Sequence, residues 1–115
     1  MNAWNDVTPI YRQLADRLTG QLLAGEPPDG QLMPSVRSLA GQYLINPLTV
    51  SRALQVLVDD GLLESRRGIG MVVQPGARAR LRRVERERFL TQEWPAVVAR
   101  LRQLGIAAHE LNWEL

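Results

Sequence analysis

The sequence predicts a mainly α-helical fold with one small β-hairpin, arranged as a domain over residues 1–75 and a short helical tail over residues 76–115. Apolar residues recur at three- and four-residue spacing in several segments, which is the period of a helix. Two short apolar runs on either side of a glycine-bearing loop indicate paired strands instead. With 115 residues, the chain has room for one compact domain and a small appendage.

The first helix is predicted to begin at Thr8 and Pro9, a hydroxyl cap followed by a proline in the first helical position. Its apolar residues follow at four-residue spacing and form one stripe: Ile10, Leu14, Leu18 and Leu22. Glycine and proline residues between 25 and 30 end this helix, and a short strand is expected at 31–33.

Two further helices are predicted from their capping residues. Ser35 caps a short helix that runs to about Gln42. Asn46 and Pro47 repeat the cap-then-proline signal and open a third helix, which stops at Gly61. The third helix is expected to bury one apolar face: Val50, Leu54 and Leu57.

The hairpin is predicted from the apolar runs at 62–63 and 71–73, with a loop at 64–70 between them. The order helix, helix, turn, helix and hairpin is that of a winged helix-turn-helix. The major groove of B-DNA admits one α-helix, and a hairpin beside that helix can reach an adjacent groove or phosphate. The layout therefore predicts a DNA-binding domain.

The tail is predicted to be helical from Ala77 and to carry an apolar seam: Leu90, Trp94, Val97, Leu101 and Leu104. Such a seam favours a dimer interface, and a shallow effector cavity is the alternative. Pro95 interrupts the seam, so it either kinks one long helix or starts a second. We expect a break near residues 91–94.

Positive charge is concentrated after the middle of the chain. All fourteen cationic residues are arginine, which makes bidentate contacts with phosphate and guanine. Residues 1–60 hold four arginines and six carboxylates, whereas residues 61–91 hold eight arginines and three carboxylates. The arginines between Arg78 and Arg88 fit three roles: a solvated helix face, phosphate contacts, or salt bridges across a dimer.

Four blocks of the sequence resemble the motifs of GntR-family regulators. They are Pro9-Ile-Tyr-Arg-Gln-Leu, Pro34-Ser-Val-Arg-Ser-Leu-Ala, Asn46-Pro-Leu-Thr-Val-Ser-Arg-Ala-Leu-Gln-Val-Leu, and Asp60-Gly-Leu-Leu followed by Arg66-Arg-Gly-Ile-Gly. They stand in the family's order: opening, second helix, recognition helix and wing. The short tail resembles the YtrA-like subfamily, in which the tail serves dimerisation.

The resemblance and the helical wheel together indicate the residues that bind DNA: Ser35, Arg37, Asn46, Leu48, Thr49, Ser51, Arg52, Arg66, Arg67, Gly68 and Gly70. Arginine suits phosphate or guanine, and short hydroxyls suit phosphates and base edges. Some of these residues have a structural alternative. Arg37 could pair with a carboxylate, Ser51 could be merely solvated, and Asn46 could do no more than cap its helix.

Leu48 and Ile69 depart from the family pattern, because relatives often carry polar or cationic residues at these positions. Leu48 either contacts thymine methyl groups or folds back onto the core. Ile69 makes the wing tip less charged, so Arg67 and the backbone of Gly68 are expected to carry the contact of the wing with DNA.

These features predict a sequence-specific repressor that binds a palindromic operator as a homodimer. Its own operon is the expected target, and the resemblance suggests an ABC-transporter operon. Whether a small-molecule effector exists stays open. A winged helix used only for protein contacts is the alternative interpretation, and such binding would depend little on salt.

No catalytic residue, metal site or cofactor is expected. The chain has no cysteine, and its single histidine, His109, has no visible cluster of partner ligands. The sequence also lacks the pattern of a signal peptide and any apolar run long enough to cross a bilayer. We therefore expect a cytoplasmic protein that is not an enzyme.

Overall fold

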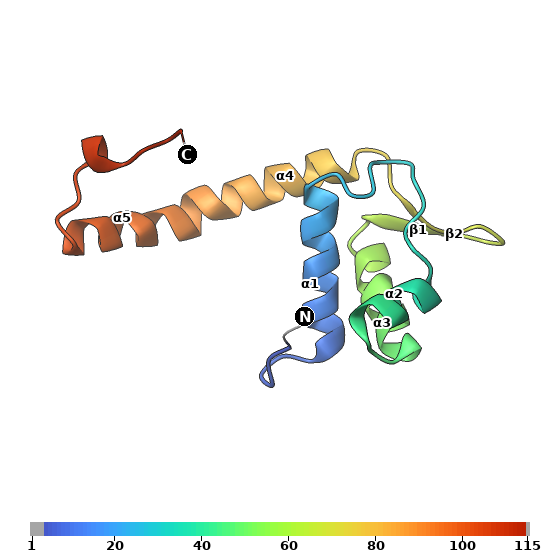
Figure 1. The fold of residues 1–115 in the computed structure, drawn as a ribbon. Helices are drawn as coiled ribbons and strands as arrows, with labels where there is room; N and C mark the ends of the chain where they lie inside the picture. Colours follow the sequence, from blue (N-terminus) through green and yellow to red (C-terminus); the bar gives the residue numbers. More distant parts are fainter. Residues whose placement is uncertain (1–3, 115) are drawn as a thin grey trace. The chain divides into compact units, whose positions relative to one another are not determined.

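The computed structural model describes residues 4–114, and the chain forms two compact units that divide after Leu81. We refer to the residues up to Leu81 as the winged unit and to those from Arg82 onward as the tail unit. The elements are mainly α-helices with one antiparallel hairpin, as the sequence predicts (Figure 1). No helix within the described residues combines the length and apolar character needed to cross a bilayer.

The winged unit has the predicted order of elements. Its helices are α1 (Ile10–Leu23), α2 (Val36–Tyr43) and α3 (Pro47–Asp59), followed by strands β1 (Leu63–Arg66) and β2 (Gly70–Val73). The strands pair antiparallel, with Leu63 opposite Val73 and Arg66 opposite Gly70. This arrangement is a winged helix-turn-helix.

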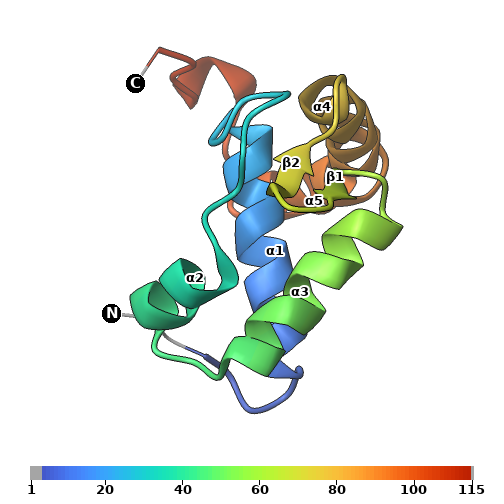
Figure 2. The same cartoon turned by 90° about the vertical axis from the view of Figure 1, so that its right-hand side faces the viewer.

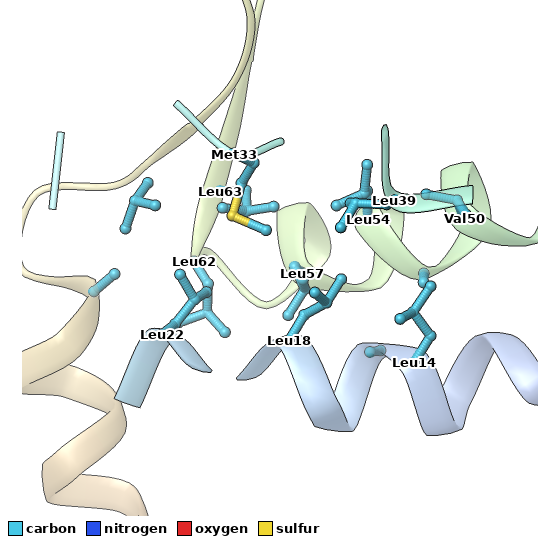
Figure 3. Close-up of a cluster of buried hydrophobic side chains, with 14 of the residues drawn as sticks. Leu14, Leu18, Leu22, Met33, Leu39, Val50, Leu54, Leu57, Leu62 and Leu63 are labelled. Carbon is cyan, nitrogen blue, oxygen red and sulfur yellow. The ribbon is translucent and has the colours of Figure 1, made fainter. Parts of the chain in front are cut away.

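The core of the winged unit lies between α1, α3 and the hairpin. Figure 3 shows leucines of α1 pointing toward those of α3 and β1. The fully buried members include Leu14, Leu18, Leu22, Leu54, Leu57 and Leu63. Ile10 was predicted to continue this stripe, but its side chain is 40% exposed because it lies on the first turn, beyond the packed part of α1.

The helix ends agree with the predicted caps at α2 and α3 but not at α1. The Ser38 amide donates to Ser35 Oγ at 3.0 Å, and the Leu48 amide donates to Asn46 Oδ1 at 2.8 Å. The α1 helix starts one residue late, with Pro9 extended and no side-chain cap. Gln13 Nε2 reaches back instead and donates to the Thr8 carbonyl at 2.6 Å.

The strand expected at 31–33 is reduced to a single antiparallel bridge between Leu32 and Val72. The Met33 amide donates to the Met71 carbonyl at 2.8 Å, which places this segment on the outer edge of β2. The hairpin strands are longer than predicted, so the loop shrinks to residues 67–69.

The α4 helix (Ala77–Arg88) begins in the winged unit and continues into the tail unit. It is followed by a π-helical turn, η1 (Phe89–Glu93), by α5 (Trp94–Gln103), and by a short 3₁₀ turn, η2 (Ala108–Glu110).

The expected helix break at 91–94 is wrong, because the backbone stays helical through Glu93 and Trp94. The Trp94 amide donates to the Phe89 carbonyl, five residues back, and thus forms a π turn. Inserting one wide turn just before Pro95 accommodates the missing proline N–H without ending the helix.

Candidate nucleic-acid interface

The first two turns of α3 carry three of the polar residues that the sequence predicts to bind DNA. Ser51 and Arg52 are exposed and Thr49 is half-buried, whereas Val50 between them is fully buried. This division follows from the helical period, because the apolar stripe packs on α1 and leaves the neighbouring positions facing outward. Arg37, on the first turn of α2, is exposed as well.

Two predicted contact residues, Ser35 and Asn46, act as helix caps through their side-chain oxygens. Both residues are also exposed at the surface. Capping occupies an oxygen acceptor, while the serine O–H and the asparagine N–H groups are chemically able to donate to DNA. Capping and DNA contact are therefore compatible at these positions.

Leu48 lies on the surface with 78% of its side chain exposed. The alternative that it folds back onto the core is wrong, because Leu48 stands two residues before the buried Val50 and therefore points to nearly the opposite side of α3. Together with residues of α1 and α3, Leu48 lines a shallow depression of about 400 Å³; the other lining residues are Ile10, Tyr11, Thr49 and Arg52.

Arg52 lies over the aromatic ring of Tyr11, with its guanidinium carbon 4.0 Å from the ring centroid. Arg12 lies 5.5 Å from the centroid of the same ring. Tyr11 was not among the residues predicted to bind DNA, although it belongs to the first of the four family-like motifs. Its position inside that block was the available signal, but the pairing with Arg52 depends on the packing of α1 against α3.

The wing tip is a tight turn in which the Ile69 amide donates to the Arg66 carbonyl at 3.0 Å. Gly68 has a φ of 77°, a conformation that glycine adopts without a Cβ penalty. Arg67 and Ile69 are exposed on this turn. Arg66 lies 3.5 Å from the Glu64 carboxylate in an exposed ion pair.

The basic segment of α4 divides into structural and outward-facing parts. Arg78 donates through Nε to the Leu23 carbonyl at 2.8 Å, and Arg80 donates to the Gly61 carbonyl. Arg78 thus pairs with a carbonyl in the last turn of α1, and Arg80 pairs with a carbonyl just beyond the end of α3. Arg88 forms an ion pair with Glu85 at 2.7 Å. Arg82, Arg83 and Arg86 are exposed, as are the other arginines of α4.

The predicted seam residues of the tail lie at or near the surface. Leu90, Trp94, Val97 and Leu104 are exposed, and Leu101 is half-buried. Phe89, which was not predicted to belong to the seam, packs near Trp94 with ring centroids 6.5 Å apart. The π turn accounts for this pair, since it brings residues five apart onto nearly the same face.

A partly buried helix that exposes polar side chains at its start, beside an arginine-bearing wing, is typical of a winged helix-turn-helix DNA-binding protein. The family model "Bacterial regulatory proteins, gntR family" matches residues 10–73, which is more than half of the chain. The chain therefore belongs to the gntR family of transcriptional regulators.

Individual relatives agree with this assignment. The HTH-type transcriptional repressor YtrA of Bacillus subtilis is 36% identical over 94% of this chain and 77% of its own length. The structure resembles YtrA from Sulfolobus acidocaldarius with a TM-score of 0.59 and 29% identity, covering 89% of this chain and 98% of that one. It also resembles the AraR DNA-binding domain solved with operator ORR3, with a TM-score of 0.56 and 26% identity over 64% of this chain and 88% of that one. The chain is thus a YtrA-like regulator and not an enzyme.

Proposed function

We propose that this chain is a cytoplasmic transcriptional repressor that binds a palindromic operator as a homodimer. The observation that carries the proposal is the polar start of α3, where the exposed Ser51 and Arg52 and the half-buried Thr49 flank the buried Val50. A helix of this kind fits the major groove, where arginine recognises guanine and short hydroxyls contact base edges or phosphates. The similarity to a repressor and to an operator-bound domain supports it.

In this proposal residues 1–75 bind DNA and residues 76–115 form the dimer. Arg37 contacts phosphate from α2, Leu48 contacts a thymine methyl group, and Arg52 reads guanine. The full contact set is the one named from the sequence: Ser35, Arg37, Asn46, Leu48, Thr49, Ser51, Arg52, Arg66, Arg67, Gly68 and Gly70. The pair of Arg66 with Glu64 is exposed and hence weak, so Arg66 can exchange it for a phosphate.

Dimerisation through the tail is supported by the burial pattern of α5. No residue of α5 is buried, and this helix lies entirely within the described residues. In proteins most of the stability of a helix comes from packing of its apolar face, and the apolar face of α5 is left largely exposed. A second copy of the same seam supplies that packing, and two-fold symmetry then matches a palindromic operator.

The regulated genes follow from the resemblance rather than from the geometry. We propose that the protein represses its own operon and that this operon encodes an ABC transporter. A small-molecule effector would act by changing the operator affinity of the dimer.

Selection of binding duplexes from a random DNA pool tests the proposal directly. We expect an inverted repeat whose half-sites are about one helical turn apart. Affinity should fall steeply as salt rises, because phosphate binding releases counterions. Recovery of no preferred sequence, or affinity that is insensitive to salt, would contradict the DNA-binding function.

Substitution of Arg52 tests the assigned reading face. Arg52→Ala should weaken operator binding about 10- to 100-fold, the range for loss of a bidentate base contact. Arg52→Lys is the matched control, because it keeps the positive charge but cannot make the bidentate hydrogen bonds of a guanidinium. We expect Lys to retain non-specific affinity while losing base preference, as measured by fluorescence anisotropy on operator and scrambled duplexes. Unchanged operator affinity of Arg52→Ala would show that the reading face is assigned to the wrong residues.

A further inference from the structure

The start of α1 lies beside the reading end of α3. Figure 2 shows the N-terminal ends of these two helices at the same end of the winged unit. Tyr11 comes from the first turn of α1, and its half-buried ring faces the Arg52 guanidinium at 4.0 Å. An aromatic residue outside the helix-turn-helix therefore touches the side chain assigned to base reading.

The geometry of this contact leaves the arginine able to read a base. A guanidinium stacks through its flat face, whereas its N–H donors lie around its edge. A guanidinium placed over a ring can keep its edge donors turned away from it, so contact with Tyr11 is compatible with bidentate donation to the O6 and N7 atoms of guanine.

Holding Arg52 before DNA arrives also lowers the cost of binding. An exposed arginine loses rotamer freedom when it is ordered at an interface, and that loss reduces affinity. Tyr11 is itself partly packed against the hydrophobic core, so the ring provides a fixed platform. Ile10 and Leu48 add apolar walls to the depression that Tyr11 and Arg52 line.

We propose that Tyr11 is a positioning residue that orients Arg52 for guanine recognition, so that α1 contributes to the operator's sequence preference. This inference rests on the proposed operator-binding function. It assigns Tyr11 no contact with DNA, since it acts through Arg52.

The experiment compares Tyr11→Leu with Tyr11→Phe, using the full chain and the duplex selected by the wild-type protein. Leucine removes the π face, while phenylalanine keeps it. Tyr11→Leu should weaken operator binding about five-fold, which corresponds to an exposed cation–π contact. Tyr11→Phe should bind within about two-fold of wild type, because the aromatic ring is retained.

Two further readouts separate positioning from a general structural role. With duplexes changed one base pair at a time, Tyr11→Leu should lose discrimination only where Arg52→Ala loses it. In an Arg52→Ala background, Tyr11→Leu should cause no additional loss of affinity. Arg12→Ala is the matched control, because it removes the other cation near this ring, and base preference should stay as in wild type.

The inference fails if Tyr11→Leu weakens binding equally with and without Arg52, or weakens it uniformly at every base pair. Either result would assign Tyr11 to the stability of the winged unit, which thermal unfolding of the same variants would measure. If the wild-type protein selects no sequence at all, the operator-binding function and this inference fall together. If it selects one but Tyr11 and Arg52 are uncoupled, only this inference is overturned.

Discussion

At the scale of single residues, short-range hydrogen bonds and one unusual backbone conformation define the helix-turn-helix. Ser35 and Asn46 cap the two helices on either side of the turn. Between them, Leu44 adopts the left-handed conformation with φ 57° and ψ 50°, and its side chain is 86% exposed. A leucine there bears the steric cost of its Cβ and gains little from burial.

Leu44→Gly should therefore stabilise the protein. We expect the free energy of unfolding to rise by about 0.5–1 kcal/mol. This gain is the strain relieved at the left-handed position, minus the cost of ordering glycine, which has more conformational freedom in the unfolded chain. Urea titration followed by circular dichroism measures this change. Leu44→Ala is the control: it removes the same exposed chain but keeps Cβ, so it should bring no comparable gain. Equal stabilisation by alanine would refute the backbone argument.

At the scale of secondary-structure elements, the start of α4 is held by residues from distant parts of the winged unit. The Asp29 carboxylate accepts the Gly76 amide at 2.8 Å and the Arg78 amide at 3.3 Å, so it caps α4 from 47 and 49 residues away. The Arg78 side chain meanwhile donates to the Leu23 carbonyl, near the C-terminus of α1. The sequence left the role of the arginines in this segment open. Hydrogen bonds to main-chain carbonyls give two of them, Arg78 and Arg80, a structural role.

Removing the Asp29 carboxylate should destabilise the start of α4. Asp29→Ala is expected to lower the free energy of unfolding by about 1 kcal/mol, the usual cost of losing an N-cap acceptor. Asp29→Asn keeps one acceptor oxygen and should lose less than alanine does. Thermal and urea unfolding of both variants provide the measurement. A loss that is equal in the two variants would point to charge rather than capping as the origin of the effect.

At the scale of the whole molecule, the tail carries apolar side chains that lie at the surface. Trp94 and Val97 are exposed on α5, and Leu101 is half-buried on the same helix. The preceding π turn keeps α4 and α5 in one helical run despite Pro95. These features support a seam that is completed by a second chain.

A charge placed in the seam should separate the proposed dimer. Val97→Glu is expected to give a monomer by light scattering at micromolar concentration, because a carboxylate would have to be buried unpaired. Affinity for the palindromic duplex should drop by about 100-fold or more as bivalent binding is lost, while half-site binding changes little. Ala99→Glu places the same charge nearly opposite on the helix and should leave the dimer intact. A dimer that survives Val97→Glu would exclude this seam as the interface.

The sequence by itself determined the features that depend on local signals. Helical periodicity and the caps at Ser35 and Asn46 locate α2 and α3, and the glycines at 68 and 70 locate the hairpin. The gntR-family motifs were readable for the same reason, since each is a continuous run of residues. Local signals define the ends of elements less well: the structure differs from the prediction at the Thr8 cap, at the helix break expected before Pro95 and in the length of the hairpin loop.

Only the tertiary structure decided which side chains of different elements contact one another. Packing of α1 on α3 places Tyr11 beneath Arg52, leaves Ile10 partly exposed and keeps Leu48 at the surface. Packing of the loop after α1 against α4 makes Asp29 a cap. The physical reason is the same in each case, because contacts between residues distant in the chain depend on how helices pack and leave no periodic or local pattern to read.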